Sequence, residues 1–467
     1  MTQIKFGTDG WRAIIARDYT ETNVMRVAEA TAKWILAKPE GKSKAIIGYD
    51  CRFAGEMFMQ ATARVFAAHG ITCVVAHNFI STPMVSLATV KLNADAGIVI
   101  TASHNPPSYN GFKIKDSFGG PAVPAEIAKV EAMIPETIET NYGSFESYVV
   151  SGLIQFEDLE GLYLEAIKKG IDFNLINKAN KELAYDAMYG AGQSAMRNLL
   201  PETTFLHCEF NPSFDGQAPE PIHKNLSELS DLISISEDID LGIATDGDAD
   251  RIGLYNSTGK FIDSHHIILL LIQYLHKYKG MSGKVVNSFS CTGKIKNLCK
   301  HYGLKQEVTK IGFKYICDII IAEDVLIGGE ESGGIAIKGH IPERDGLWIG
   351  LTILEFMAAT GKSLDELIEE VYNITGSFAV ERYDLHIDEA TKQKVIANCK
   401  SKAFTSFGNF VIESEEDMDG YKYHLGNDQW VMIRPSGTEP VLRVYAESAN
   451  SEKAFEILEA TKKVILS

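Results

Sequence analysis

A repeated alternation of strand and helix patterns is the feature that most constrains the fold of this chain. Short β-branched runs, which are typical of buried strands, alternate with segments in which apolar residues recur at helical spacing. The alternation passes through three cycles, and each cycle closes with a strand that leads into a Gly- or Asp-rich polar loop. Helices between successive strands predict mostly parallel sheets covered by helices. The strands behind this prediction are residues 44–49, 72–76, 98–100, 183–188, 241–244, 284–287 and 325–327.

The last part of the chain follows a different pattern. After Ser377 we expect a helix over 388–404, several short strands, and a closing helix over 451–466. Strands 430–433 and 441–446 flank a short loop and should therefore pair antiparallel. With 467 residues the chain is too long for one hydrophobic core. The sequence thus predicts several α/β domains followed by a smaller α+β domain.

Composition excludes several kinds of partner. The formal net charge of −17 argues against nucleic acid and against an anionic membrane surface. No apolar run approaches the roughly 20 residues of a membrane span, and the first residues lack the apolar core of a signal peptide. The seven cysteines form no CxxC pair, which indicates reduced thiols rather than disulfides or a zinc site. We expect a cytoplasmic protein that binds a small molecule, and we leave its oligomeric state open between monomer and dimer.

Ser103 lies in the loop that follows the strand 98–100, in the sequence Thr-Ala-Ser-His-Asn-Pro-Pro. Ligands bind at the carboxyl ends of strands in open α/β sheets, so this hydroxyl is placed to carry a phosphoryl group. A serine that caps a turn is the structural alternative. In an extended segment His104 would point to the opposite face, which places it poorly for deprotonating Ser103. Lys113 is the nearest other candidate base, and the surroundings do not match the GxSxG pattern of esterases.

Three aspartates follow the strand 241–244 and are separated by single small residues: Asp246, Asp248 and Asp250. Carboxylates this close repel one another unless a cation lies among them, and oxygen ligands favour Mg²⁺, Mn²⁺ or Ca²⁺. An EF-hand loop is excluded because its sixth position is Arg251 rather than Gly and its twelfth is Ser257 rather than Glu. A solvated acidic turn is the remaining alternative. The adjacent arginine favours Mg²⁺ acting beside a phosphate.

Two further loops carry polar groups of complementary kinds. The sequence Gly-Glu-Glu-Ser-Gly-Gly over 329–334 offers carboxylates and a hydroxyl that suit the hydroxyls of a sugar. The sequence Arg-Pro-Ser-Gly-Thr over 434–438 combines a guanidinium, two hydroxyls and exposed amides, which suit a phosphate. Arg443 could add a second positive charge. Either loop could instead be an ordinary turn.

One feature points to a different function. Residues Gly190–Ala195 match the G-x-G-x-x-A pattern of dinucleotide-binding folds, and Glu209 lies 19 residues after Gly190. Pro212 and Pro219 interrupt the expected continuation. A nicotinamide-dependent enzyme is therefore a remote alternative. No Walker loop is present, because the GK[ST] triplets at Gly41 and Gly361 lack the preceding glycine.

Taken together, these loops resemble the α-D-phosphohexomutase family, which comprises the phosphoglucomutases and phosphomannomutases. The resemblance covers essentially the whole chain. It implies three similar mixed α/β domains and a C-terminal α+β domain of TATA-binding-protein-like fold around a central cleft, which we place at residues 1–147, 148–256, 257–374 and 375–467. The motifs that carry it are Phe6-Gly-Thr-Asp-Gly-Trp-Arg12, Thr101-Ala-Ser-His-Asn-Pro106, Asp246-Gly-Asp-Ala-Asp-Arg251, Gly329-Glu-Glu-Ser332 and Arg434-Pro-Ser-Gly-Thr-Glu-Pro440.

The resemblance also implies roles for individual residues. Ser103 would be the phosphoserine, and its phosphate would join the three aspartates in holding one Mg²⁺. One of Arg12, His104 and Lys113 would manage the proton of the attacking hydroxyl, and which one stays open. The substrate-binding residues would be Arg251, Lys314, Glu330, Ser332, Arg434, Ser436, Gly437, Thr438 and Arg443, of which the last five hold the non-reacting phosphate.

Substrate preference follows from smaller similarities. The sequences Gly312-Phe-Lys314 and Asp345-Gly-Leu-Trp348 resemble the phosphoglucomutase branch. Gly334 stands where many phosphomannomutases have His, and Glu331 stands where glucosamine-phosphate mutases typically have Gln. We therefore expect interconversion of glucose 1-phosphate and glucose 6-phosphate, with glucose 1,6-bisphosphate as intermediate and activator. A phosphomannomutase, an enzyme of dual specificity, and a sugar-phosphate-binding protein without turnover are the alternatives.

Overall fold

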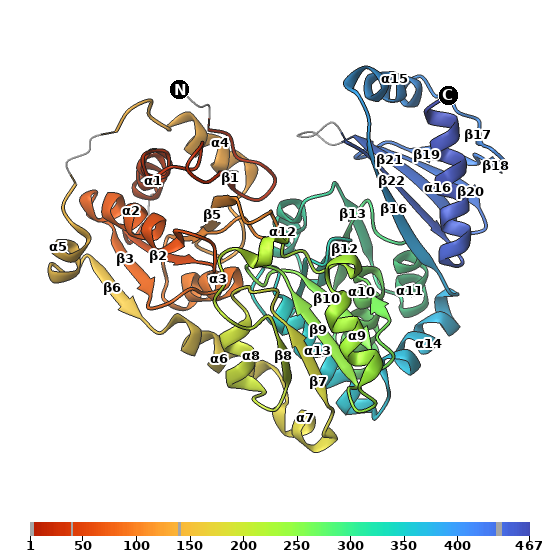
Figure 1. Ribbon diagram of the computed structural model, residues 1–467, viewed down its shortest axis with the longest axis horizontal. Coiled ribbons are helices and arrows are strands. Elements are labelled where there is room, and N and C mark those ends of the chain that lie inside the picture. Colours follow the sequence, from red (N-terminus) through yellow and green to blue (C-terminus); the bar gives the residue numbers. More distant parts are fainter. Residues whose placement is uncertain (1–3, 39–40, 139–141, 436–440) are drawn as a thin grey trace. The chain divides into compact units, whose positions relative to one another are not determined.

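The computed structural model describes residues 4–38, 41–138, 142–435 and 441–467 (Figure 1). The chain forms two compact units. Unit 1 comprises Met1–Lys284 and Gly312–Leu367, and unit 2 comprises Val285–Ile311 and Ile368–Ser467. Among the described residues, no helix is both long enough and apolar enough to cross a bilayer.

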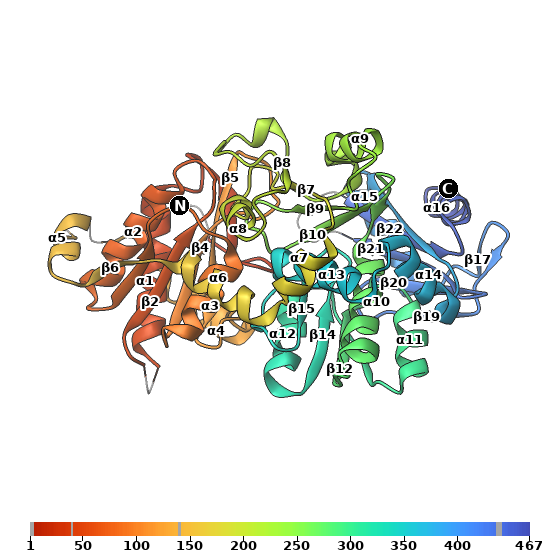
Figure 2. The ribbon, with the colours of Figure 1, turned by 90° about the horizontal axis from the view of Figure 1, so that it is seen from below.

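The first sheet of unit 1 has the strand order β1-β5-β4-β2-β3-β6 (Figures 1 and 2). Strands β4, β2, β3 and β6 are parallel, whereas β5 pairs antiparallel with β4, and β1 with β5. Helices α1 and α2 pack on the face that carries Ala45 and Ile47. On the other face Gly48 lies against Val85 of α3, where a larger side chain would overlap it. The elements are β1 (Trp11–Ile14), α1 (Glu21–Leu36), β2 (Lys44–Tyr49), α2 (Gly55–Ala68), β3 (Thr72–Ala76), α3 (Thr82–Lys91), β4 (Ala96–Ile100), β5 (Tyr109–Asp116), α4 (Pro124–Ala132), α5 (Phe145–Val150) and β6 (Ile154–Glu157).

The second sheet has the order β11-β10-β9-β7-β8. Strands β8, β7 and β9 are parallel, and β9 turns into β10 as an antiparallel hairpin. The three aspartates lie in the turn of this hairpin. The elements are α6 (Leu159–Gly170), α7 (Phe173–Ala179), β7 (Leu183–Asp186), α8 (Gln193–Leu199), β8 (Thr204–Leu206), α9 (Ser227–Ile235), β9 (Leu241–Thr245), β10 (Ile252–Asn256) and β11 (Phe261–Ile262).

The rest of unit 1 begins with α10 (Ser264–Gln273), which continues as a π-helical turn over Tyr274–Tyr278. After the segment that belongs to unit 2, α12 (Phe313–Ala322) leads to the antiparallel pair of β14 (Val325–Gly329) and β15 (Ile335–Ile337). The Glu330 loop joins these two strands. Helix α13 (Gly346–Thr360) follows, and Asp345 caps its N-terminus through the N–H of Trp348. Helix α14 (Leu364–Thr375) then leads out of the unit.

Unit 2 holds a parallel strand pair and an antiparallel sheet. Strands β12 (Lys284–Ser288) and β13 (Gln306–Thr309) are parallel and flank α11 (Lys294–Tyr302). The antiparallel sheet has the order β16-β22-β21-β20-β19, and residues of α15 and α16 share its core. Its elements are β16 (Ala379–His386), α15 (Glu389–Lys400), β19 (Ser414–Glu416), β20 (Tyr421–Gly426), β21 (Gln429–Pro435), β22 (Val441–Ser448) and α16 (Ser451–Ile465), beside a small pair of β17 (Ser406–Phe407) and β18 (Phe410–Val411).

The expected fold class, mixed α/β domains with a C-terminal α+β domain, is confirmed. Strands 44–49 and 72–76 have the expected bounds, and the strands on either side of the Arg434 loop pair antiparallel as expected. The strand expected over 183–188 ends at Asp186, because Met188 and Tyr189 take positive φ angles of 48° and 59°. The sequence pattern did not reveal β10, whose run of five residues is short and contains Gly253.

Candidate active site

The loop after β4 places Ser103 in a buried position at the carboxyl end of that strand. Ser103 adopts a left-handed backbone conformation, with φ of 53°, which is unfavourable for residues other than glycine. Its N–H donates to Oγ1 of Thr101 at 2.8 Å, and Thr101 in turn donates to Oδ2 of Asp50 at 2.5 Å. The serine is therefore held in an uncommon conformation by hydrogen bonds on its N-terminal side.

His104 lies closer to Ser103 than we expected. Its Nδ1 is 3.3 Å from Oγ of Ser103, so the prediction that the two side chains point to opposite faces is wrong. The left-handed conformation of Ser103 removes the alternation of an extended chain, on which that prediction depended. Burial and the neighbouring cations Arg251, Arg12 and Lys113 lower the pKa of His104 well below its usual value. The imidazole is thus neutral and lies among positive charges.

The turn of the β9–β10 hairpin is fixed by backbone hydrogen bonds from three distant segments. The N–H groups of Thr82, Ala191 and Gly346 donate to the carbonyl oxygens of Asp248, Gly247 and Ala249, at 3.0 Å in each case. At Gly247 a Cβ atom would lie 2.5 Å from the carbonyl oxygen of Ser103. Only glycine therefore lets the Ser103 loop approach the aspartates this closely.

The structure brings Ser103 and the three aspartates together. Oγ of Ser103 donates to Oδ2 of Asp246 at 2.7 Å. One carboxylate oxygen from each of the three aspartates lies within 4.8 Å of the corresponding oxygens of the other two. All three residues are buried. Burial and the adjacent Asp248 and Asp250 raise the pKa of Asp246 well above its usual value.

Two oxygens of this cluster point to a bound cation. Oδ1 of Asp248 and Oδ1 of Asp250 are buried and have no hydrogen-bond partner. A buried carboxylate oxygen without a partner is unfavourable, and a divalent cation with oxygen ligands would satisfy both atoms. The residues present therefore fit a hard divalent metal ion.

The Oδ2 atoms of Asp248 and Asp250 are paired with buried cations. Nζ of Lys113 lies 2.7 Å from Oδ2 of Asp248, 2.9 Å from Oδ2 of Asp250 and 2.8 Å from Oδ2 of Asp9. Nη2 of Arg344 lies 2.7 Å from Asp250 and 2.5 Å from Asp9. Although burial opposes it, the carboxylates of Asp248, Asp250 and Asp9 raise the pKa of Lys113. Lys113 is therefore an ammonium group in this arrangement.

Several residues that pair with the aspartates were not predicted from the sequence. Asp9 lies inside the Phe6–Arg12 motif but received no role of its own. Arg344 precedes the Asp345–Trp348 sequence, and Glu343 accepts from Lys115 at 2.5 Å. Their pairing depends on segments more than 200 residues apart, so local sequence patterns carry no signal for it.

The Glu330 loop is joined to the aspartate turn through the backbone. The N–H of Ile252 donates to the carbonyl oxygen of Gly333 at 3.2 Å, and Arg251 forms a β-bridge with Gly334. The carboxylate of Glu330 is buried, which raises its pKa to about 7, and Oε1 accepts from the N–H of Gly312 at 2.9 Å. Ser332 lies in the same loop and is partly exposed.

The remaining predicted residues of unit 1 lie on nearby elements. Nη1 of Arg12 donates to Oδ1 of Asn105 at 2.7 Å, in the Ser103 loop. Arg251 lies 3.9 Å from Glu220, and its buried Nε has no hydrogen-bond partner. Lys314, on the first turn of α12, extends over the ring of Tyr315 at 5.3 Å from the ring centroid.

In unit 2 the structure places two arginines opposite each other. Arg434 on β21 is the direct cross-strand partner of Arg443 on β22. Like charges in this position repel each other. Asp419, 3.3 Å from Arg434, and Asp384, 3.7 Å from Arg443, partly offset this repulsion. Such a pair favours an anionic ligand. Ser436, Gly437 and Thr438, which we assigned to the same ligand, lie outside the described residues.

The segment Gly190–Ala195 has a structural role that accounts for its glycines. A Cβ at Gly190 would lie 2.6 Å from the carbonyl oxygen of Asp246, and one at Gly192 would overlap the hydroxyl of Tyr185. Ala191 donates to the aspartate turn, as described above. Close packing against the aspartate turn and Tyr185 therefore accounts for both glycines without a dinucleotide, which disfavours the nicotinamide alternative.

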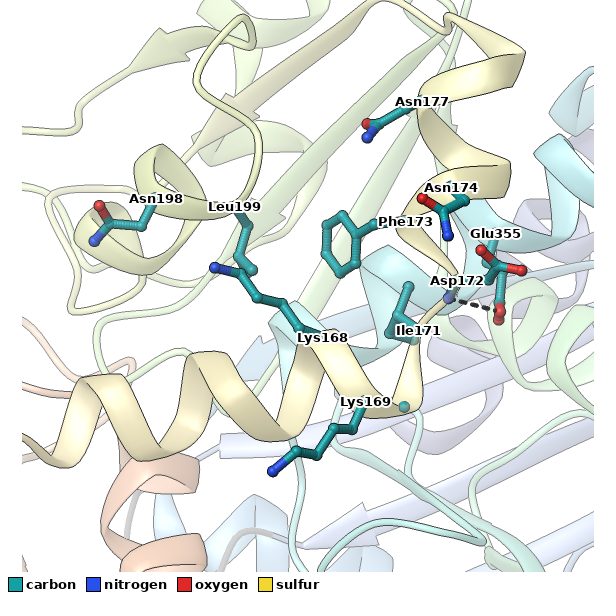
Figure 3. A pocket seen from close by; sticks show the side chains of 11 residues that line it. Lys168, Lys169, Ile171, Asp172, Phe173, Asn174, Asn177, Asn198, Leu199 and Glu355 are labelled. Carbon is teal, nitrogen blue, oxygen red and sulfur yellow. Dashed lines mark hydrogen bonds between the residues drawn. The ribbon is translucent and has the colours of Figure 1, made fainter.

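A cavity of about 690 Å³ elsewhere in unit 1 is distinct from this site (Figure 3). It lies among α6, α7, α8 and α13, and the ring of Phe173 and the side chain of Lys168 border it. Glu355 at its wall already accepts from the N–H of Asp172 at 3.1 Å and from Lys279 at 2.7 Å. No predicted site residue within the described part of the chain lines this cavity.

The fold and the site define an α/β enzyme in which a serine hydroxyl faces a group of carboxylates that could hold a cation. Four domain models of the phosphoglucomutase/phosphomannomutase family match the chain: alpha/beta/alpha domain I over residues 3–141, domain II over 162–259, domain III over 263–374, and the C-terminal domain over 392–464. The chain therefore belongs to the phosphoglucomutase/phosphomannomutase family. Its members are phosphohexomutases, which are intramolecular phosphotransferases.

Individual relatives have different names. The chain is 30% identical over 466 residues to a phosphoglucomutase/phosphomannomutase of Thermococcus kodakarensis, with 98% of both chains covered. It is also 30% identical over 466 residues to a probable phosphoglucosamine mutase of Methanobrevibacter smithii, again with 98% of both covered. A crystal structure of a putative phosphomannomutase from Thermus thermophilus superposes with a TM-score of 0.88 at 32% identity and full coverage of both chains. These names leave the sugar open.

The raised pKa of Glu330 gives a pH-dependent prediction. Since its pKa is about 7 in the folded protein against 4.5 ordinarily, the buried site favours the protonated form. The protonated Glu330 side chain stabilises the folded state fully below pH 4.5, and this stabilisation is lost as the pH rises to 7. The variant Glu330→Gln should therefore gain stability relative to the parent as the pH is raised from 4.5 to 8, by up to roughly 3 kcal/mol.

Thermal unfolding at pH 5, 6, 7 and 8 measures this difference. Glu237→Gln provides the control, because it makes the same replacement at an exposed position outside the site. A difference between Glu330→Gln and the parent that stays constant from pH 5 to pH 8 would contradict the prediction.

Proposed function

We propose that this protein interconverts glucose 1-phosphate and glucose 6-phosphate through a phosphoserine at Ser103 and a glucose 1,6-bisphosphate intermediate. The observation that carries the proposal is the 2.7 Å contact of Ser103 Oγ with Asp246, beside two aspartate oxygens that lack a hydrogen-bond partner. A serine that only caps a turn would not need its hydroxyl beside a group of buried aspartates, whereas a phosphoserine that shares a divalent cation with them would.

The metal in this proposal is one Mg²⁺ held by Asp246, Asp248, Asp250 and an oxygen on Ser103. Oxygen ligands and a buried position suit this hard cation. When bound, Mg²⁺ neutralises negative charge on the phosphoryl group. Lys113 pairs with Oδ2 of Asp248 and Arg344 with Oδ2 of Asp250, so these two cations hold the aspartates in place and limit the net charge of the site.

The chemical step moves one phosphoryl group. The 6-hydroxyl oxygen of glucose 1-phosphate forms a bond to phosphorus while the bond from phosphorus to Ser103 Oγ breaks, and the hydroxyl proton passes to a group of the protein. Of the candidates Arg12, His104 and Lys113, Lys113 is an ammonium group and has no free lone pair for a proton, whereas the neutral imidazole of His104 lies 3.3 Å from Oγ. In the second half of the reaction Ser103 Oγ forms a bond to the phosphorus at the 1-position while the bond from that phosphorus to the 1-oxygen breaks. The 1-oxygen receives the proton that the protein took up, which releases glucose 6-phosphate.

Both halves of the reaction use the same sugar and phosphate contacts. Glu330 and Ser332 are proposed to form hydrogen bonds with the sugar hydroxyls. Arg251 and Lys314 are proposed to bind the substrate beside them. The N–H of Gly312 donates to Glu330, so the helix that carries Lys314 begins beside the Glu330 loop. The facing Arg434 and Arg443, with Ser436, Gly437 and Thr438 by resemblance, are proposed to hold the phosphate that does not react.

The identity of the nucleophile is tested by Ser103→Ala. We expect intact-mass measurement to find a phosphorylated fraction in the parent and none in the variant, and mutase activity to fall by at least about a thousandfold. Ser108, which is exposed in the same loop, provides the matched control, and Ser108→Ala should keep both properties. Full activity of Ser103→Ala would exclude the phosphoserine.

The metal site is tested by cation binding rather than by turnover. We expect Asp248→Asn to weaken binding of Mn²⁺, used as a paramagnetic substitute for Mg²⁺, by at least about tenfold, because one ligand loses its charge. Electron paramagnetic resonance of free Mn²⁺ measures this. The exposed Asp238 offers the control Asp238→Asn, which should bind as the parent does. Equal binding by parent and Asp248→Asn would place the cation elsewhere.

The sugar preference is tested by kcat/KM for glucose, mannose and glucosamine 1-phosphates, each with its own 1,6-bisphosphate as activator. We expect glucose 1-phosphate to be preferred over each of the others by about tenfold or more, within the range that pocket contacts provide. A preference for mannose or glucosamine 1-phosphate would leave the phosphohexomutase activity in place and correct the substrate.

A further inference from the structure

Arg52 is a buried arginine that carries no role in the proposed reaction. It follows the carboxyl end of β2, and its side chain is fully inaccessible to solvent. It lies in the first sheet domain, where β2 and β4 are adjacent parallel strands. The Ser103 loop leaves the end of β4, so Arg52 and this loop start at neighbouring points of the same sheet edge.

The guanidinium group of Arg52 binds four carbonyl oxygens of the Ser103 loop. Nη2 donates to the carbonyl oxygens of Ser103 at 2.7 Å and Asn105 at 2.6 Å. Nη1 donates to those of Pro106 and Tyr109, both at 2.9 Å. Buried carbonyl groups need donors, and here one planar group with a fixed fork supplies all four.

The hydrogen bonds of Arg52 fix the C-terminal side of Ser103, which Thr101 and Asp50 do not contact. Thr101 and Asp50 fix the N–H side of Ser103, as described above. Arg52 fixes its carbonyl side, and that same carbonyl oxygen is the atom that lies against Gly247 of the aspartate turn. The left-handed conformation of Ser103 needs support from its surroundings, because the backbone alone disfavours it.

Arg52 is itself held on both sides. The N–H of Arg52 donates to Oδ1 of Asp50 at 3.0 Å, and Nε lies 3.4 Å from Oδ2 of the same residue. The guanidinium carbon lies 5.1 Å from the centroid of the Phe214 ring. The position of the fork is therefore determined before any substrate binds.

We propose that Arg52 is a positioning residue for phosphoryl transfer, which holds Ser103 Oγ at the aspartate cluster through the loop backbone without touching the substrate. The inference rests on the function proposed above for Ser103. Displacements of about 1 Å at a reacting atom can cost a hundredfold in rate, so loss of the fork should act on turnover. Binding of the sugar uses other loops and should change little.

Lysine and alanine variants of Arg52 test this in the full-length, Mg²⁺-loaded enzyme. Lysine keeps the charge but has a single donor atom, so it cannot bind four carbonyls in a plane. We expect Arg52→Lys to lower kcat for glucose 1-phosphate by at least about a hundredfold and to change KM by less than about threefold. For Arg52→Ala, added guanidinium at about 50 mM should restore kcat at least about tenfold, whereas equal concentrations of NaCl or urea should not.

Arg26 provides the matched control. It is also buried, and it also donates to a backbone carbonyl, that of Pro135 at 2.7 Å, but it lies on α1 away from the Ser103 loop. Arg26→Lys and Arg26→Ala should keep kcat within about threefold of the parent, and guanidinium should leave them unchanged. The proposal is overturned if Arg52→Lys keeps the parent's kcat, or if Arg26→Lys loses as much kcat as Arg52→Lys.

Hydrogen exchange separates this inference from the proposed function. Peptides that cover residues 101–109 should exchange at least about tenfold faster in Arg52→Lys than in the parent, while peptides from α1 should not change. This readout decides the positioning role even if the parent proves to have no mutase activity, in which case the proposed function alone fails. Unchanged exchange over 101–109 would overturn the positioning role. Should Arg52→Ala not fold, Arg52→Lys still gives both kcat and exchange.

Discussion

The site in unit 1 depends on the compensation of charge around three buried aspartates. Asp246, Asp248 and Asp250 are fully buried, and an isolated carboxylate in such a position would be strongly unfavourable. Lys113 and Arg344 pair with the oxygens on one side, and Ser103 donates to Asp246. Two oxygens stay without a partner, on Asp248 and Asp250. These two oxygens fit a divalent cation among the three aspartates.

Close approaches of the backbone make this arrangement possible. Gly247 allows the carbonyl of Ser103 to lie against the aspartate turn, and Gly190 allows the β7–α8 connection to lie against Asp246. Backbone donors from Thr82, Ala191 and Gly346 then fix the turn. Glycine is needed at these positions because any side chain would meet backbone atoms, which cannot move aside as a flexible side chain can.

Much of the fold could be predicted from the sequence because its elements follow local rules. Strands such as 72–76 are β-branched runs, and helices such as α1 begin at a capping residue, here Thr20, which accepts from the N–H of Asn23. The ends of elements were less predictable where the chain takes positive φ angles at residues other than glycine, as at Met188. The contact of His104 with Ser103 was misjudged for the same reason, because an extended chain was assumed where the backbone is left-handed.

The candidate groups could be named from the sequence alone: in unit 1 the serine loop, the three aspartates and the Glu330 loop, and in unit 2 the arginines Arg434 and Arg443. These groups lie in short contiguous motifs, and their chemistry can be read from residue type and spacing. The partners of these groups are visible only in the folded chain. Arg344 contacts Asp9, which is 335 residues away in the sequence, and it also contacts Asp250. Arg52 donates hydrogen bonds to the carbonyl oxygens of the Ser103 loop. Such pairs leave no local pattern, because they form when segments that are distant in the sequence fold against one another, and neighbouring residues do not determine them.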